Sequence, residues 1–287
     1  MSARRLALPP GFDPGPALSY HGRDQQSPAE RVEGTRLTKA LLLDGAPALL
    51  TIAIGPAEAE ISVDRPGLED AAARIAARML GLLHDPAGFE QRAAREPEIA
   101  RLIGGRAGYR MPLAPSIFEA VAWAIIGQQI NLTFAATLRR ELILLAGRPH
   151  PSGMIAHPSP EDVARLDREQ LLERRFSRQK ADYLIGLCRA VVEGSLDLEG
   201  LASLPPEEAH ARLVALKGIG PWTAQYILLR GCGFPDCVPV GDAGLAAALQ
   251  RFHGMDRRPT AQEQAALMAP YAPWRSLATA HMWASLG

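Results

Sequence analysis

The residue with the clearest chemical use is Asp242, which follows the loop 238–241 and precedes the helical stretch 243–249. An aspartate in this place can cap the helix with its side chain. The positive end of a helix also favours an ionised carboxylate. Such a carboxylate can stabilise an oxocarbenium-like sugar, or orient a water molecule that attacks it, when a base leaves its sugar. The sequence leaves open which of these two roles dominates.

A glycine turn precedes Asp242. Gly218, Ile219 and Gly220 join two predicted helices within the segment 216–224, and Trp222 lies twenty residues before Asp242. A turn of this kind directs backbone N–H groups and a helix N-terminus outward, which suits a phosphate and discriminates little between sequences. A plain helical hairpin has the same pattern, and the turn alone does not decide between the two interpretations.

Three aromatic residues could accompany this aspartate. Trp222 and Tyr226 are four residues apart, so they project from one helix face, and Trp283 lies on the last predicted helix. Any one of them could be an ordinary core residue. As a set beside Asp242 they favour a stacking site for a flat ring, with cation–π attraction if that ring is positively charged.

The elements that carry these residues fall into two kinds. Residues 1–112 are expected to form a small α+β domain with strands at 48–54 and 59–63, a turn at Asp44-Gly45 and a helix at 68–83. Residues 113–230 and 231–287 are expected to be helical, with the second of these domains packing near residues 89–112. The predicted helices begin at Ser116, where Glu119 would complete a capping box, and then follow at 133–145, 160, 179–193, 206–216, 221–230, 261 and 273–286.

Composition limits the class of protein. The chain has 31 basic and 31 acidic side chains in 287 residues, with 47% hydrophobic and 22% charged residues, as in a globular protein. No segment forms a basic domain, which by itself argues against a protein that coats nucleic acid. Three cysteines cannot supply the four thiolates of an iron–sulfur cluster. We see neither a signal peptide nor a transmembrane run, and expect a cytoplasmic monomer.

The hairpin, the Gly/Pro-rich loop after it and Asp242 together resemble the helix–hairpin–helix DNA glycosylase superfamily. The segments 125–129, 273–276 and 281–283 are similar to its 3-methyladenine DNA glycosylase II branch, and the resemblance covers nearly the whole chain. It implies an α+β fold and a hydrolase of base excision repair that flips alkylated purines out of duplex DNA. Glycosylases for deaminated or oxidised purines, and a non-catalytic module that binds distorted DNA, remain the alternatives.

The resemblance also implies roles for individual residues. Asp242 would be catalytic, and Trp222, Tyr226 and Trp283 would bind the damaged base. DNA contacts would come from six residues of two loops: Gln128, Gln129, Gly218, Ile219, Gly220 and Thr223. The carbonyls of Val214, Leu216 and Ile219 would hold a Na⁺ or K⁺ ion, and no other cofactor is expected. Tyr109 and Trp274 are weaker candidates for the base pocket, and packing is the simpler interpretation of Trp274. Arg275 could contact a phosphate or hold the C-terminal helix. A basic group could face a phosphate or be merely solvated: Arg174, Arg175, Arg178, Lys180 and Arg189.

Three positions bear on the detail of that function. Relatives that also cut the strand carry a lysine where this chain has Trp222, which implies hydrolysis without lyase activity. Some relatives insert an apolar wedge where this chain has Gln129, which could hydrogen-bond the orphaned base but would stack less well. A polar helix end before a loop is the simpler interpretation of Gln128 and Gln129. Gly241 replaces an acidic residue of some relatives.

Overall fold

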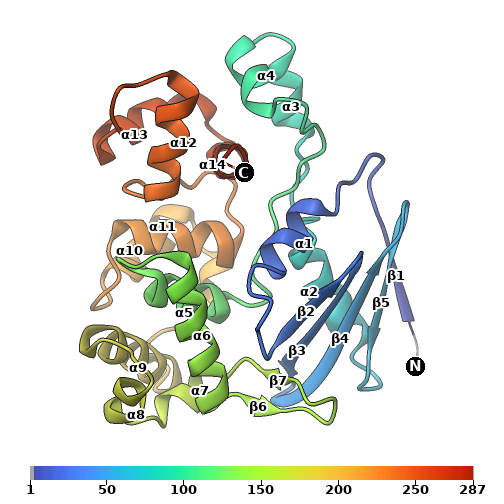
Figure 1. Ribbon diagram of the computed structural model, residues 1–287, viewed down its shortest axis with the longest axis vertical. Helices are drawn as coiled ribbons and strands as arrows, with labels where there is room; N and C mark the ends of the chain where they lie inside the picture. The colour runs from blue at the N-terminus through green and yellow to red at the C-terminus, as the bar shows by residue number, and fades with distance from the viewer. Residues whose placement is uncertain (1–2, 287) are drawn as a thin grey trace.

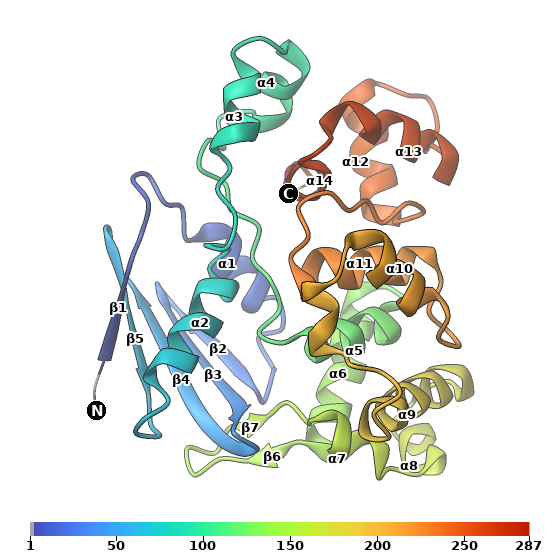
Figure 2. The ribbon, with the colours of Figure 1, turned by 180° about the vertical axis from the view of Figure 1, so that it is seen from behind.

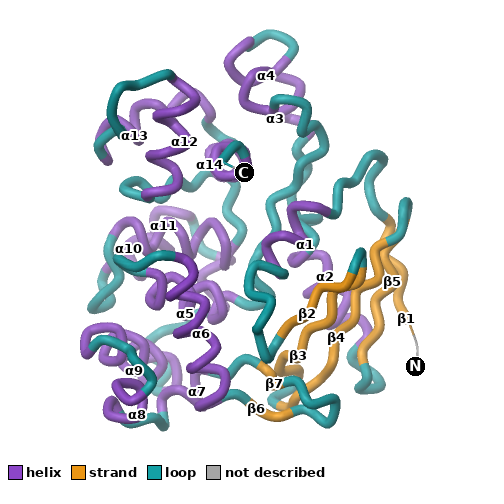
Figure 3. Tube along the Cα trace, in the orientation of Figure 1, coloured by secondary structure: helices purple, strands orange, loops and turns teal. Residues whose placement is uncertain are grey.

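The computed structural model describes residues 3–286 and has an antiparallel sheet beside a body of helices (Figure 1). The sheet has five strands in the order β1-β5-β4-β3-β2. Its strands are β1 (Ala3–Ala7), β2 (Glu30–Glu33), β3 (Arg36–Leu43), β4 (Ala46–Ile54) and β5 (Glu58–Val63), and a small second sheet pairs β6 (Arg148–Pro149) with β7 (Ile155–Ala156). Figure 3 shows that the strands lie on one side of the molecule.

The predicted strands are present because their apolar residues alternate. In β4, Leu50, Ile52 and Ile54 are buried, while the residues between them are half-buried. The two-residue turn Asp44-Gly45 joins β3 to β4, and both of its residues have positive φ, as a tight hairpin turn requires. The predicted helix of this domain is α2 (Glu69–Met79). Its buried residues pack on the sheet face that carries the buried residues of β4 (Figure 2).

The rest of the chain is helical. Before the body come α1 (Gly15–His21), α2 (Glu69–Met79), α3 (Ala87–Ala93) and α4 (Pro97–Ile103). The body contains α5 (Ile117–Gly127), α6 (Leu132–Ala146), α7 (Pro160–Ala164), α8 (Arg168–Glu173), α9 (Arg178–Val192), α10 (Pro206–Val214), α11 (Pro221–Ile227), α12 (Ala243–His253), α13 (Ala261–Met268) and α14 (Arg275–Ala284). None of the helices between residues 3 and 286 could cross a membrane.

The cores follow from these elements. One apolar core joins α5, α6, α9, α10 and α11. A separate core packs α3 and α4 against α12, α13 and α14, so residues that are distant in the chain share one apolar cluster. Trp274 belongs to this second core through Phe89, with ring centroids 6.5 Å apart, as its packing interpretation predicts.

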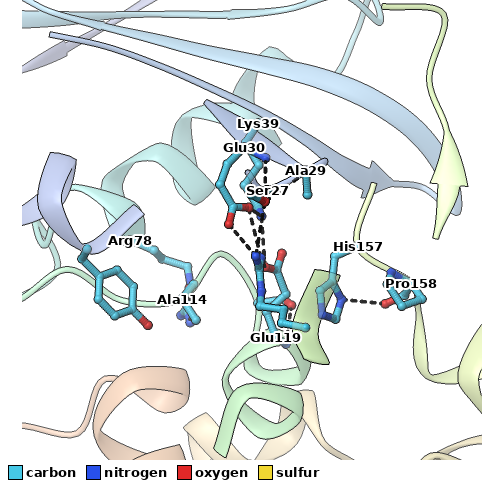
Figure 4. A network of polar contacts seen from close by, with 12 residues as sticks. Ser27, Ala29, Glu30, Lys39, Arg78, Ala114, Glu119, His157 and Pro158 are labelled. Atoms are coloured by element: carbon cyan, nitrogen blue, oxygen red, sulfur yellow. Dashed lines mark hydrogen bonds and ion pairs between the residues drawn. The ribbon is translucent and has the colours of Figure 1, made fainter. Parts of the chain in front are cut away.

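One predicted capping box is wrong. Ser116 accepts a hydrogen bond from the Glu119 amide, but the Glu119 side chain does not return the contact. Instead it enters a buried ion network with Lys39 of β3, Arg139 of α6 and Glu30 of β2 (Figure 4). Lys39 Nζ lies 2.8 Å from Glu30 and 3.0 Å from Glu119, and Arg139 lies 2.5 and 3.2 Å from the same carboxylates. Two opposite charges are a stronger partner for a buried carboxylate than its own helix end.

We expect the stability of the protein to fall below neutral pH because three histidines are buried. Burial lowers the pKa of His21 and His281 to about 3 and that of His157 to about 4, from 6.5. A lowered folded pKa means that the stability is fully present above the unfolded pKa and is lost as the pH falls toward the folded one. The free energy of unfolding should decrease by roughly 1 kcal/mol per histidine over the pH unit below 6.5.

Urea denaturation on both sides of that pH unit measures the effect. Most carboxylates titrate at lower pH, so the histidines dominate this window. A free energy of unfolding that stayed constant across it would contradict the assignment of three neutral, buried imidazoles.

Candidate active site

The Asp242 carboxylate is held by three N–H groups. Its Oδ1 accepts hydrogen bonds from the Leu245 amide at 2.7 Å and from Trp283 Nε1 at 2.9 Å. Its Oδ2 accepts one from Trp222 Nε1 at 3.1 Å. The predicted N-cap is therefore confirmed, and the same carboxylate also joins two indole rings. Three donors fix the position of the carboxylate and leave acceptor capacity on Oδ2.

Two glycines give this carboxylate its place. Gly241 has φ +88, a conformation that side chains rarely adopt, and its amide donates to Gln264 Oε1 at 2.8 Å. A Cβ at Gly244 would lie 3.1 Å from Asp242 Oδ1 and 3.3 Å from Trp283 Cδ1. The absence of a side chain at position 244 therefore lets the indole approach the carboxylate.

The structure brings the three predicted aromatic residues together. The ring centroids of Trp222 and Tyr226 are 5.8 Å apart, and those of Tyr226 and Trp283 are 6.3 Å apart. Tyr226 is buried, whereas both tryptophans are half-buried. We call these three residues the aromatic cluster. Because two of its members hydrogen-bond Asp242, the cluster and the carboxylate form one site.

Three further residues complete this site, and no local sequence pattern indicates them: Tyr20 of α1, Arg23 just after α1, and Arg230 between α11 and α12. Tyr20 of α1 lies under the Arg230 guanidinium at 4.6 Å, and Arg230 also lies 5.2 Å from the Trp283 ring. Arg23 stacks on Tyr20 at 4.3 Å. Burial acts to raise the pKa of Tyr20, but Arg23 and Arg230 outweigh it and hold that pKa below its usual range. The N-terminal domain thus reaches the aromatic cluster.

The predicted glycine turn joins α10 to α11. Gly218 has φ +88, and a Cβ there would lie 2.2 Å from the Tyr183 ring, so only glycine fits. The Ile219 amide donates to the Leu216 carbonyl at 3.1 Å, which closes the turn. Gly220 is the N-cap residue of α11, and Pro221 follows at its first position. α11 then continues as a π-helix over Leu228–Cys232.

Gln128 connects this turn to the loop between α5 and α6. Its side-chain amide donates to the Gly218 carbonyl at 2.9 Å and to Thr223 Oγ1 at 3.0 Å. Thr223 is itself buried. Gln129 is exposed and has φ +58, a backbone conformation that a glutamine seldom adopts. The two glutamines therefore differ in role. The Gln128 side chain connects two loops by hydrogen bonds, whereas Gln129 is exposed on one of them.

The structure leaves four members of the predicted basic group exposed, Arg174, Arg175, Arg178 and Arg189, and buries the fifth. Lys180 is only 8% exposed and donates to backbone carbonyls, so it does not face a phosphate. Arg174 pairs with Glu141 at 3.0 Å. Arg275 pairs with Asp236 at 2.7 Å and so fastens the start of α14. The ring centroids of Tyr109 and His281 are 4.8 Å apart. The one correction to the basic group is Lys180, because its ammonium group is buried against backbone carbonyls, which no local sequence pattern shows.

Two further features lie apart from Asp242. A groove of about 520 Å³ runs between the sheet and the helical body and includes Leu41, Phe118, His157 and Glu199 in its lining, but none of the predicted site residues. Among residues 3–286, no three His, Cys, Asp or Glu side chains are grouped as metal ligands would be.

A glycine hairpin, followed by a capping aspartate among aromatic rings, defines a helix–hairpin–helix protein of the base-excision class. Residues 122–273 match the family described as HhH-GPD superfamily base excision DNA repair protein, and the chain belongs to this family. It is 28% identical over 288 residues to the DNA-3-methyladenine glycosylase of Bacillus subtilis, covering 97% of this chain and 95% of the relative. It is 32% identical over 192 residues to DNA-3-methyladenine glycosylase 2 of Escherichia coli, covering 66% and 64%.

A solved structure agrees with the fold. The 3-methyladenine DNA glycosylase of Archaeoglobus fulgidus superimposes with a TM-score of 0.87 at 21% identity, over 98% of this chain and 97% of the other. The expected α+β fold is confirmed, as is the resemblance to the 3-methyladenine branch.

Proposed function

We propose that this protein releases alkylated purines, of the 3-methyladenine and 7-methylguanine type, from duplex DNA by hydrolysis of the N-glycosidic bond. The observation that carries the proposal is the Asp242 carboxylate held between the indoles of Trp222 and Trp283. Family membership and the names of the relatives agree with this activity. An abasic site would remain in the DNA, which we expect to be bound by a monomer in the cytoplasm, at the nucleoid if the protein is bacterial.

Asp242 can act on the sugar without a strong general acid. An alkylated purine that carries a positive charge is already a good leaving group, so the enzyme needs chiefly to stabilise the positive charge that develops on the sugar. An ionised carboxylate does this best where its own position is fixed before the reaction. The three N–H donors fix it here, and the free acceptor capacity on Oδ2 could orient the attacking water.

The aromatic cluster can select the base. Electron-rich ring faces attract a cationic purine and offer apolar contact to a base removed from the helix. Trp222 stands where lyase-active relatives of the resembled family have lysine. An indole cannot form a Schiff base with the sugar, so we propose that strand cleavage is absent.

DNA would be held by the hairpin and by the loop of Gln129. Backbone N–H groups at Gly218 and Gly220 would contact a phosphate, beside the Ile219 amide that closes the turn, and Gln129 would fill the space left by the flipped base. The carbonyls of Val214, Leu216 and Ile219 are neutral oxygen donors of the kind that suits Na⁺ or K⁺. Leu216 already accepts one hydrogen bond, and its second lone pair remains for an ion. When bound, the ion would supply positive charge toward a phosphate.

One observation favours a second candidate substrate class. Arg23 is exposed and stacks on Tyr20 beside the aromatic cluster. A guanidinium group repels a cationic base but donates hydrogen bonds to the carbonyl group of a deaminated or oxidised purine. The protein could therefore also act on such neutral lesions.

Base release from duplex DNA tests the proposal. Methylated duplex DNA and single-lesion duplexes containing hypoxanthine or 8-oxoguanine are incubated with the protein, and the released base and the strand are analysed. We expect free methylpurine, strand cleavage only after alkali treatment, and no protein–DNA adduct after borohydride. Binding to these duplexes without release of any base would identify a non-catalytic DNA-binding protein and overturn the proposal.

A further inference from the structure

Helix α9 contacts both of the loops that are proposed to meet DNA, although it contributes no group to Asp242 or the aromatic cluster. Lys180 lies in its first turn, and Tyr183 lies one turn further on. Lys180 approaches the loop between α5 and α6, and Tyr183 approaches the turn between α10 and α11. In Figure 1, α9 lies at the lower end of the helical body.

Lys180 closes the C-terminal end of α5. Its ammonium group donates to the carbonyls of Ile125 at 3.2 Å, Ile126 at 2.8 Å and Gln128 at 2.5 Å. The last carbonyls of a helix have no partner within the helix and form its negative end. A buried ammonium group with three protons satisfies three of these acceptors at once. Lys180 therefore satisfies the carbonyls at this end of α5 without a second basic side chain.

The bond from Lys180 to the Gln128 carbonyl also sets the conformation of Gln129. The carbonyl oxygen of Gln128 and the amide of Gln129 belong to one peptide plane. Gln128 has φ −56 and ψ 125, and Gln129 has φ +58, close to the central residues of a type II turn. A type II turn prefers glycine where this chain has Gln129. Fixing the Gln128 carbonyl therefore holds Gln129 in a conformation that it would otherwise leave.

Tyr183 packs against the other loop, the turn between α10 and α11. The Tyr183 ring lies so close to Gly218 that a Cβ there would be 2.2 Å from the ring. The Gly218 carbonyl in turn accepts the hydrogen bond from the Gln128 side chain at 2.9 Å. Lys180, Gln128, Gly218 and Tyr183 thus form a closed circuit of contacts that spans the two loops and one helix.

We propose that Lys180 and Tyr183 are positioning residues that fix the spacing between the Gln129 loop and the glycine hairpin, so that both can engage one DNA duplex while a base is displaced. This role rests on the proposed function. It predicts that loss of Lys180 impairs the opening of a base pair rather than the cleavage of the glycosidic bond, because Asp242 and the aromatic cluster lie on other elements.

Two substrates separate these steps. One duplex carries 7-methylguanine paired with cytosine, and the other carries it opposite a tetrahydrofuran abasic analogue, where there is no pair to open and no partner base to replace. We expect Lys180→Met to slow single-turnover release from the paired duplex at least tenfold and release from the unpaired one at most threefold. Lys180→Arg, which keeps the charge, should restore release from the paired duplex to within threefold of wild type.

A matched control is Lys39→Met, which removes another buried lysine but one that contacts neither loop. It should leave the ratio of the two rates unchanged, whatever it does to the melting temperature. Tyr183→Ala removes a half-buried ring and keeps the proposal testable if Lys180→Met does not fold. We expect Tyr183→Ala to lower release from the paired duplex severalfold and to leave the unpaired one within twofold.

The outcomes are distinct. Equal losses on both substrates, or no loss on either, would show that Lys180 and Tyr183 only support the fold and would overturn their positioning role. A wild-type protein that released no base from either duplex would instead overturn the proposed function itself.

Discussion

Asp242→Asn is expected to reduce base release from methylated duplex DNA by roughly 10³-fold, the order of loss found when one preorganised electrostatic group is removed from an active site. The neutral amide cannot balance positive charge on the sugar. Its NH₂ group also replaces an oxygen that accepts from an indole, so Trp222 or Trp283 would lose its acceptor. The melting temperature should change little, because asparagine caps a helix about as well as aspartate.

Single-turnover release of methylpurines measures the first of these effects. Asp256→Asn is the matched control, since it makes the same chemical change at an exposed position of the C-terminal region and should retain the wild-type rate. If Asp242→Asn kept a rate within tenfold of wild type, the carboxylate would not be the main catalytic group. Binding of the variant to abasic DNA distinguishes lost chemistry from lost affinity.

Glu119→Gln is expected to lower the free energy of unfolding by about 3–5 kcal/mol, as the removal of one partner from a buried ion pair typically does. All four side chains of the ion network are less than 10% exposed. Without Glu119, Lys39 and Arg139 share the single carboxylate of Glu30, and one positive charge remains uncompensated. The pKa of Glu119 is lowered to about 2, with the charges of Lys39 and Arg139 outweighing the opposing effect of burial.

The lowered pKa of Glu119 also predicts how the effect of the substitution on stability depends on pH. A folded pKa below the unfolded one means that Glu119 contributes stability that is present above pH 4.5 and is lost as the pH falls toward 2. The difference between wild type and Glu119→Gln should therefore shrink in acid. Urea denaturation near neutral pH and near pH 3 measures both values.

Glu208→Gln is the control for this prediction. Glu208 pairs with Arg212 at 2.7 Å, but both side chains are about half exposed, so its loss should cost at most about 1 kcal/mol. Similar losses for the two variants would mean that the ion network adds no more than a surface pair. A large loss for Glu119→Gln alone would show that the sheet is fastened to α5 and α6 by charge.

The local sequence predicted the parts of the fold that depend on short-range patterns. Alternating apolar residues indicated β4 and β5, and the helices α7 and α13 begin where the sequence places helices at 160 and 261. The helix from Ser116 was also placed correctly. Its Glu119 was misassigned because its partners come from two strands and another helix, and no local pattern reports such contacts.

By itself the sequence determined that Asp242 caps a helix twenty residues after Trp222, that a glycine turn precedes both, and that Trp222 excludes a lysine at that position. Only the tertiary structure decided which rings meet the carboxylate, that Tyr20 and Arg23 of the N-terminal domain join them, and that Lys180 is buried beneath a loop. Caps and turns arise from residues that are neighbours in the chain. The site is instead assembled by packing between helices that are far apart in sequence.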